Sequence, residues 1–503
     1  MKHFARVLIM SVVILPNLAA QPAGEPLTIQ GLDQRTLPDV RARGMGGAIL
    51  ASGTNASVLF LNPAGLIAVG SMEFRLSASS MGVSQSQTQE WVPNRLYAGL
   101  SLMMEDKWGN IKSPTDSNGN PFPNPWEQLQ KPFDTIGPNW KRSVKRSPPL
   151  SVAFAVPVEM DDIKFVFAIG GSQVSDLNYF FQNNNVTDPM IGSYRPEPLP
   201  ELTVAETLRV RWYQFTRKRD GNLWGVTPAI AASFGGVSIG ASATFYTGTS
   251  DDLEQRLDRG FLTFSNNRFR VQDTVQYWSL RTGTSTYSGF GALIGLKFEQ
   301  PRYALAATIR LPYMLTREYS RAFSSQQDVY FARVKYNPSR TSDSMQTTIV
   351  TASESGKEEI RFPVSYSLGL VLNPFPKWTI AVDYEMTNYN QLEYKLDNGT
   401  VSNPWVNAPS FRAGAEYRWT SWLSLRGGYR EVAQSFSPEG SAIVGDPAVM
   451  SAYSLGAGTN LFGFDLDLAY EYASLRYPDS WQSNVNHNST EQFRFLAEVG
   501  VRF

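Results

Sequence analysis

In the last eleven residues of the chain, 493–503, every second position is apolar, and charged residues lie only at the positions between. One side of this segment is wholly apolar, and the other carries three charges. The apolar side consists of Phe493, Phe495, Ala497, Val499, Val501 and Phe503. Because side chains in a strand have a period of two, this pattern predicts a strand between an apolar and a polar medium. About ten such residues, when tilted, are enough to cross a bilayer.

The same alternation recurs in the segments 378–386, 411–419 and 464–473. A soluble sandwich also alternates, but its exposed face would not be apolar and tipped with Trp and Tyr in segment after segment. Six short connections lie between strand-like runs, near residues 160–161, 235–236, 300–301, 374–376, 420–421 and 462–463. Six hairpins join twelve strands, and a first strand near 71–83 and the terminal strand make fourteen. Twelve and sixteen strands are the alternatives.

The amino terminus has the order of residues found in a secretory signal peptide. A basic stretch that ends at Arg6 precedes the apolar run 7–15, and the small residues Ala19 and Ala20 follow. The apolar run is too short to cross a membrane as a helix, and no later stretch approaches about eighteen uninterrupted apolar residues. An exported chain of this kind can still cross a membrane as a closed barrel, because closure satisfies every strand's backbone groups in lipid.

The composition argues against several classes of function. With 45 basic and 45 acidic residues the formal net charge is zero, which gives no support for a nucleic-acid partner. The chain contains no cysteine, which excludes disulfides and a lipoprotein anchor. His487 is the single histidine after the signal peptide, and it lies in a polar stretch. We therefore predict no catalytic residue, no metal site and no cofactor, and we expect that the protein is not an enzyme.

Residues 21–70 do not alternate and precede the first predicted strand. They contain a glycine-rich stretch and, after it, an Asn-Pro-Ala-Gly motif: Gly44, Gly46, Gly47, Asn62, Pro63, Ala64 and Gly65. The glycines permit tight turns of the backbone, and Pro63 disfavours helix at Asn62. The residues alone leave two interpretations open: a plug inside the barrel, or a surface turn that leads into the first strand.

In these motifs the chain resembles the FadL/TodX family of outer-membrane transporters for long-chain fatty acids and hydrocarbons. The resemblance continues at 362–363, 377–384 and 411–430. It implies an all-β fold, a transmembrane antiparallel β-barrel of about fourteen strands with an N-terminal hatch inside the lumen. It also implies lateral exit of the ligand through a gap in the wall. Residues 54–56 read Thr-Asn-Ala where the family often has Asp-Asp-Ala, so the resemblance assigns no acidic role there.

The expected organisation is a signal peptide at 1–20, a hatch at 21–70 and a barrel with long extracellular loops at 71–503. The expected location is the bacterial outer membrane, where the barrel would be a monomer in contact with lipid and lipopolysaccharide. Outer-membrane barrels typically end on an aromatic residue that the barrel-assembly machinery reads. The resemblance therefore implies that this machinery is a partner through Phe503.

The predicted external loop at 174–222 is rich in apolar and aromatic side chains. An external loop this apolar is expected to bury its surface. One interpretation is a groove that captures a hydrophobic ligand. Its candidate contacts are Tyr179, Phe180, Phe181, Trp212 and Phe215. The other interpretation is that the loops pack on each other or extend the strands.

The polar faces of the carboxy-terminal strands carry ten charged residues. These residues are Arg412, Glu416, Arg426, Arg430, Asp465, Asp467, Glu471, Arg494, Glu498 and Arg502. Adjacent strands carry opposite signs, which predicts ion pairs between strands in the lumen. One or two of the basic residues are candidates for holding a carboxylate ligand.

The leading hypothesis is passive transport of long-chain fatty acids or other hydrophobic compounds across the outer membrane. In this hypothesis an apolar lumen pocket holds the ligand, and a shift of residues 62–65 releases it. One alternative is a structural or secretion-accessory barrel that carries a protein partner, since the glycine and Asn-Pro-Ala-Gly motifs also mark PorV-like barrels. Another is a general porin, which should conduct ions.

Overall fold

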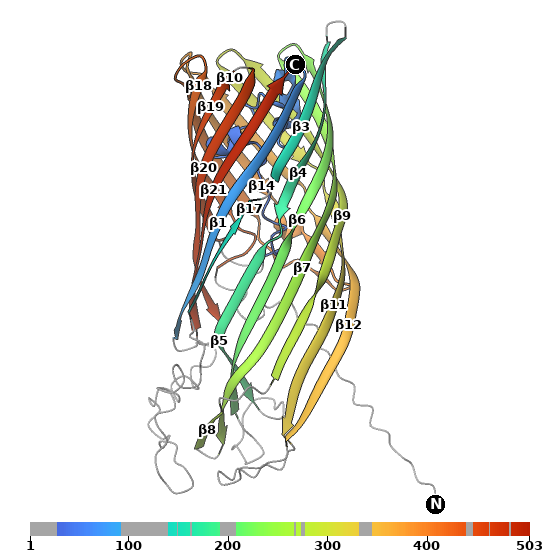
Figure 1. Cartoon of the computed structure of the whole chain (residues 1–503), viewed down its shortest axis with the longest axis vertical. Coiled ribbons are helices and arrows are strands. Elements are labelled where there is room, and N and C mark those ends of the chain that lie inside the picture. Colours follow the sequence, from blue (N-terminus) through green and yellow to red (C-terminus); the bar gives the residue numbers. More distant parts are fainter. Residues whose placement is uncertain are drawn as a thin grey trace, which may run out of the picture.

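The computed structural model describes residues 28–91, 139–147, 149–160, 163–191, 208–265, 268–272, 277–330, 345–438, 446–461, 463–481 and 484–503. Most of these residues lie in one antiparallel sheet that closes on itself (Figure 1). The first strand, β1 (Glu73–Trp91), pairs with the last, β21 (Asn484–Arg502), along its whole length. The sheet is therefore a closed barrel. The predicted signal peptide lies outside the described residues.

Fourteen strand positions make up the ring, which confirms the predicted number. Four positions hold two strands in line, and the others hold one. In chain order the ring consists of β1; β2 (Trp140–Arg146) with β3 (Pro149–Met160); β4 (Ile163–Asp176) with β5 (Tyr179–Ile191); β6 (Leu208–Phe234); β7 (Val237–Ser265); β9 (Tyr277–Gln300); β10 (Tyr303–Arg310) with β11 (Tyr313–Tyr330); β12 (Met345–Phe362) with β13 (Ser365–Leu372); β14 (Trp378–Thr387); β17 (Ala408–Arg418); β18 (Leu423–Ala433); β19 (Val449–Leu461); β20 (Phe464–Trp481); and β21.

Three short strands lie outside this ring. They are β8 (Arg268–Gln272), β15 (Glu393–Lys395) and β16 (Val401–Ser402), and they extend the sheet beside β7 and β12. None of the described helices is long and apolar enough to cross a membrane.

The six predicted short connections each join neighbouring strands of the ring. β6 ends at Phe234 and β7 begins at Val237, for example, and Gly235 between them has a φ of 63°. The predicted external loop at 174–222 was too long, because strands continue far into it. β5 runs from Tyr179 to Ile191, and β6 begins at Leu208. The alternation underestimates strand length because it weakens where a strand leaves the hydrocarbon layer.

The terminal strand has the orientation that its alternation predicted. Phe493 and Phe495 are 41% and 62% exposed on the outer surface, whereas Glu498 is fully buried on the lumen side. Large apolar side chains are also exposed on other strands around the ring, including Phe154, Phe245, Leu296, Leu370 and Leu455. An apolar outer belt around a closed barrel is the form in which strands cross the outer membrane. The protein is an outer-membrane β-barrel.

The described part of the amino-terminal segment, residues 28–70, fills the lumen near the short turns (Figure 1, blue). It forms α1 (Val40–Gly44) and two 3-10 helices, η2 (Ala56–Phe60) and η3 (Pro63–Ala68). Its apolar side chains pack against small residues of the wall: Val58, Leu59 and Leu66 lie against Ala153, Ala155, Val166, Ala229 and Ala231. The lumen hatch is therefore confirmed, and the surface-turn interpretation is wrong.

Candidate functional site

The hatch approaches the barrel wall so closely that glycine is required on both sides. Gly46 has a φ of 66°, and a Cβ there would lie 2.6 Å from the backbone nitrogen of Tyr429. On the wall, a Cβ at Gly428 would overlap the nitrogen of Gly46. Only a residue without a side chain fits such a backbone contact. All seven predicted hatch residues are buried: Gly44, Gly46, Gly47, Asn62, Pro63, Ala64 and Gly65.

Asn62 holds two parts of the hatch together. Its Nδ2 donates to the carbonyl of Leu50 at 2.8 Å, and its Oδ1 accepts from the nitrogen of Ala64 at 3.1 Å. Asn62 is therefore the N-cap of η3, with Pro63 in the first position, where its missing N–H costs nothing. A Cβ at wall residue Gly295 would overlap Oδ1 of Asn62, so this cap also lies against the barrel.

Asp383 on β14 binds the hatch from the wall. Its Oδ2 accepts from the backbone nitrogens of Ile49 and Leu50, at 2.7 and 3.0 Å. The sequence pattern placed Asp383 on the polar face of its strand but did not predict this role. Backbone donors of an irregular segment must be satisfied somewhere, and which wall residue does so depends on the docked position of the hatch.

Arg75 on β1 lies among four carboxylates next to the hatch. It contacts Glu73 at 2.7 Å and Glu498 at 3.2 Å. It also contacts Asp465 at 2.8 Å and Asp467 at 3.4 Å. These side chains are largely buried, and buried charges are tolerated only when they are paired. We call Arg75 and these four residues the floor cluster.

The floor cluster also holds the hatch. Oε2 of Glu73 accepts from the nitrogen of Ala56 at 2.8 Å, and Oε2 of Glu498 accepts from the hydroxyl of Ser57 at 3.1 Å. Loss of the cluster is therefore expected to loosen η2 as well as the wall.

A second group of charges surrounds α1. Arg43 of the hatch and Arg430 of β18 both contact Oε1 of Glu471, each at 2.9 Å. Burial lowers the pKa of Arg43 to about 10, although the charge of Glu471 acts in the opposite direction. Arg494 on β21 is opposite Glu471 in the register, and Arg412 on β17 is opposite Arg430, so four arginines gather around α1.

The predicted pairing of lumen charges is confirmed for nine of the ten residues. Arg426, for example, contacts Glu416 at 2.6 Å and Asp467 at 2.5 Å. Arg494 is the exception among the described residues, because its Nη2 contacts the sulfur of Met81 at 2.9 Å rather than a carboxylate.

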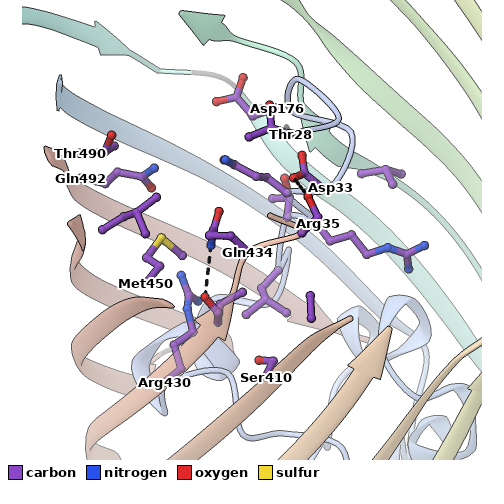
Figure 2. Close-up of a pocket in the computed structure, with 18 of the residues that line it drawn as sticks. Thr28, Asp33, Arg35, Asp176, Ser410, Arg430, Gln434, Met450, Thr490 and Gln492 are labelled. Atoms are coloured by element: carbon purple, nitrogen blue, oxygen red, sulfur yellow. Dashed lines mark hydrogen bonds between the residues drawn. The ribbon is translucent and has the colours of Figure 1, made fainter. Parts of the chain in front are cut away.

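A cavity of about 300 Å³ lies between the hatch, the wall and β5 (Figure 2). Its lining includes eight arginines and three carboxylates. The arginines are Arg35, Arg43, Arg142, Arg146, Arg310, Arg412, Arg430 and Arg494. The carboxylates are Asp33, Asp176 and Glu385. The prediction of an apolar lumen pocket was wrong, because the inward faces of these strands bring charged residues to the cavity. Sequence reasoning missed Arg35 and Arg310, since one lies in the irregular hatch and the other at the end of a strand.

Three of the predicted ligand contacts, Tyr179, Phe180 and Phe181, line this cavity. The ring of Phe180 lies 5.4 Å from the ring of Trp140 on β2, which lines the cavity too. Phe215 packs behind Phe181, with 6.4 Å between the ring centroids. Trp212 belongs to β6, but its side chain lies outside the described structure.

The wall beside this cavity has a break in its hydrogen bonding. β3 and β4 pair as far as Ser151↔Ser172. Beyond that point β2 and β5, which lie in line with them, do not pair with each other in the described part of the chain. The edge of β4 that is left free bonds to the hatch instead, where the nitrogen of Thr36 donates to the carbonyl of Val174 at 2.9 Å. Hatch and wall break are thus in direct contact.

Comparisons with known proteins agree with this architecture. A protein-family model named BamG matches residues 238–421, less than half of the chain. No curated protein matches the sequence.

The solved structures compared cover nearly the whole chain. The crystal structure of a Pseudomonas aeruginosa FadL homologue is 12% identical and has a TM-score of 0.54, over 95% of this chain and all of the other. A TodX deltaS2S3 mutant, named a monoaromatic hydrocarbon channel, is 12% identical with a TM-score of 0.55, over 92% of this chain and 98% of the other. The protein therefore has the fold of the FadL/TodX outer-membrane channels.

Proposed function

We propose that the protein passes hydrophobic compounds, such as long-chain fatty acids or hydrocarbons, passively across the outer membrane. The observation that carries this proposal is the cavity beside a buried hatch, with the aromatic residues Tyr179, Phe180 and Phe181 in its lining. Aromatic side chains offer a large apolar surface to a ligand, and pockets of a few hundred Å³ suit small molecules. The fold shared with channels for such compounds supports the proposal.

In this proposal the aromatic residues of β5 collect the ligand and the cavity holds it. A shift of the hatch around Asn62 and Gly65 then releases it. The break between β2 and β5 is the proposed exit, because Trp140 and Phe180 lie on its two sides and also line the cavity. An exit there would let an apolar ligand move directly from the lumen into the surrounding lipid.

The test is the flux of a radiolabelled long-chain fatty acid, and separately of toluene, into liposomes that contain the purified protein. We expect protein-dependent flux with little ion conductance in planar bilayers. Flux equal to that of empty liposomes for both compounds would overturn the proposal, and a large ion conductance would indicate a general porin.

A matched pair of variants tests the hatch. Asn62→Ala removes the cap of η3 and is expected to raise ion conductance and to change flux. Asn398→Ala changes an exposed asparagine at a surface turn and is expected to leave both unchanged. Normal flux and conductance in Asn62→Ala would remove the release step from the proposal.

A second candidate function is a structural or secretion-accessory barrel that carries a protein partner. The match to the BamG model over residues 238–421 is the observation that favours it. Contact with the barrel-assembly machinery through Phe503 belongs to the same group of proposals, and Phe503 is 69% exposed beyond the end of β21. Purification of the protein with a stoichiometric partner, together with flux no greater than that of empty liposomes, would favour this candidate.

A further inference from the structure

Two pairs of like charges face each other directly on neighbouring strands of the lumen wall. Asp467 on β20 is opposite Glu498 on β21, and Arg412 on β17 is opposite Arg430 on β18. Like charges in this position destabilise a sheet. The acidic pair is bridged by Arg75, whose Nη1 lies 3.4 Å from Asp467 and 3.2 Å from Glu498. Across the described ranges, no carboxylate contacts both arginines of the basic pair.

Several donors of the basic pair lack a partner. Arg412 uses Nη2 to contact Glu385, and Arg430 uses Nη2 to contact Glu471. Nε of Arg412, Nε and Nη1 of Arg430, and the hydroxyl of Ser410 are buried without a hydrogen-bond partner in the described structure. Arg430 is only 6% exposed. Buried donors without partners are costly, and a group of them in one cavity indicates a site for an acceptor.

The charges around this pair do not balance. The register and the ion pairs place Arg43, Arg412, Arg430 and Arg494 beside Glu385 and Glu471. Four guanidinium groups and two carboxylates leave an excess of two positive charges. Planar guanidinium groups bind oxyanions through paired hydrogen bonds. A single dianion would neutralise the group and satisfy its free donors.

A row of apolar side chains continues from these arginines along the wall. Val432 lies two residues from Arg430 and therefore on the same face of β18. In register, Val432 is opposite Met450 and Met450 is opposite Leu475. All three line the cavity, and Figure 2 shows Arg430 and Met450 on the same wall. The lumen thus places an apolar surface directly beside a cationic one.

We propose that the cavity binds an amphiphile with a dianionic oxyanion head, such as a phosphate monoester. The head lies between Arg412 and Arg430, and the apolar tail lies along Val432, Met450 and Leu475. This inference names a ligand class for the proposed function. It rests on that function only where it takes the bound compound to be one that the barrel transports. The binding itself is measurable without transport.

The first experiment is calorimetry with the purified full-length protein in a neutral detergent. Hexyl phosphate, inorganic phosphate, hexanoate and hexanol are compared at about pH 8, where a phosphate monoester is a dianion because its second pKa is about 6. We expect hexyl phosphate to bind at least about tenfold more tightly than each of the other three compounds. A tenfold difference in affinity corresponds to the contribution of one charge-assisted hydrogen bond. If inorganic phosphate bound as tightly as hexyl phosphate, the apolar tail would contribute nothing and the proposal of an amphiphilic ligand would be wrong. If hexanol bound as tightly as hexyl phosphate, the proposal of an anion site would be wrong.

Variants separate the head from the tail. Arg430→Gln and Arg412→Gln are each expected to lower the affinity for hexyl phosphate about tenfold. Arg412→Lys should lower it less, because lysine keeps the positive charge but lacks the paired donors of a guanidinium group. Met450→Ser is expected to weaken hexyl phosphate but not inorganic phosphate. Arg476→Gln changes an exposed arginine outside the cavity lining and is the control. Unchanged binding in both Gln variants would overturn the proposal.

The failure of this site and the failure of the proposed function give different results. If the wild-type protein binds hexyl phosphate but passes neither fatty acid nor toluene, the binding site is supported and the proposed transport function is wrong. If the protein passes those compounds but binds hexyl phosphate no better than hexanol, the transport function is supported and the proposed binding site is wrong.

Discussion

The floor cluster and the arginine pair are both buried on the lumen wall, yet they are paired differently. In the floor cluster, Arg75 lies among four carboxylates, and two of these also accept hydrogen bonds from the hatch. Around Arg412 and Arg430, positive charge exceeds negative charge and donors remain without partners. A saturated network suits a structural role, because any change leaves a buried charge unpaired. An unsaturated one suits a site that a ligand completes.

The largest effect is expected from Arg75→Met in the floor cluster. Removing the shared cation leaves the fully buried Glu498 without a cationic partner in the described structure and weakens the pairing of the other three carboxylates, which costs about 3–5 kcal/mol. The free energy of unfolding in urea, followed by the electrophoretic mobility of the folded barrel, measures this loss. Arg361→Met is the control, because its ion pair with Glu393 is exposed and contributes at most about 1 kcal/mol. Equal stability of the two variants would contradict a structural role for the floor cluster.

An intermediate effect is expected from Gly428→Ala, which acts on the hatch rather than on charge. The added methyl group overlaps the nitrogen of Gly46, and overpacking of this kind costs about 1–3 kcal/mol. We expect that the barrel stays folded, that the hatch is displaced, and that ion conductance in planar bilayers rises. Gly427→Ala on the same strand has its nearest neighbour at 4.0 Å and should behave as wild type. Low conductance in Gly428→Ala would indicate that the hatch does not close the lumen.

The smallest effect on stability is expected from Arg430→Gln. Glu471 keeps its contact with Arg43 at 2.9 Å, and the substitution removes the repulsion between two facing arginines. The free energy of unfolding should change by less than about 1 kcal/mol, because charge repulsion and lost hydrogen bonds offset each other. Urea unfolding of Arg430→Gln and of Arg75→Met under the same conditions measures the difference between their free energies of unfolding. A loss as large as that in Arg75→Met would show that both clusters are structural.

The amino-acid sequence by itself determined the class of fold and the direction in which most strand residues point. Phe493 and Phe495 face outward and Glu498 faces inward, because side-chain direction in a strand alternates with a period that any short segment displays. The short turns could also be predicted, since Gly235 and Gly236 lie between two alternating runs. The motif from Asn62 to Gly65 indicated the hatch only through resemblance to known transporters.

The tertiary structure alone decided which side chains meet in the lumen. Asp383 binds Ile49 and Leu50, more than three hundred residues earlier in the chain, and nothing local to either segment encodes that contact. Arg412 faces Arg430, while Arg75 bridges Asp467 and Glu498, because register and barrel closure bring distant strands together. Alternation assigns a residue to the lumen face, but its neighbours there depend on how all fourteen strands close around the hatch.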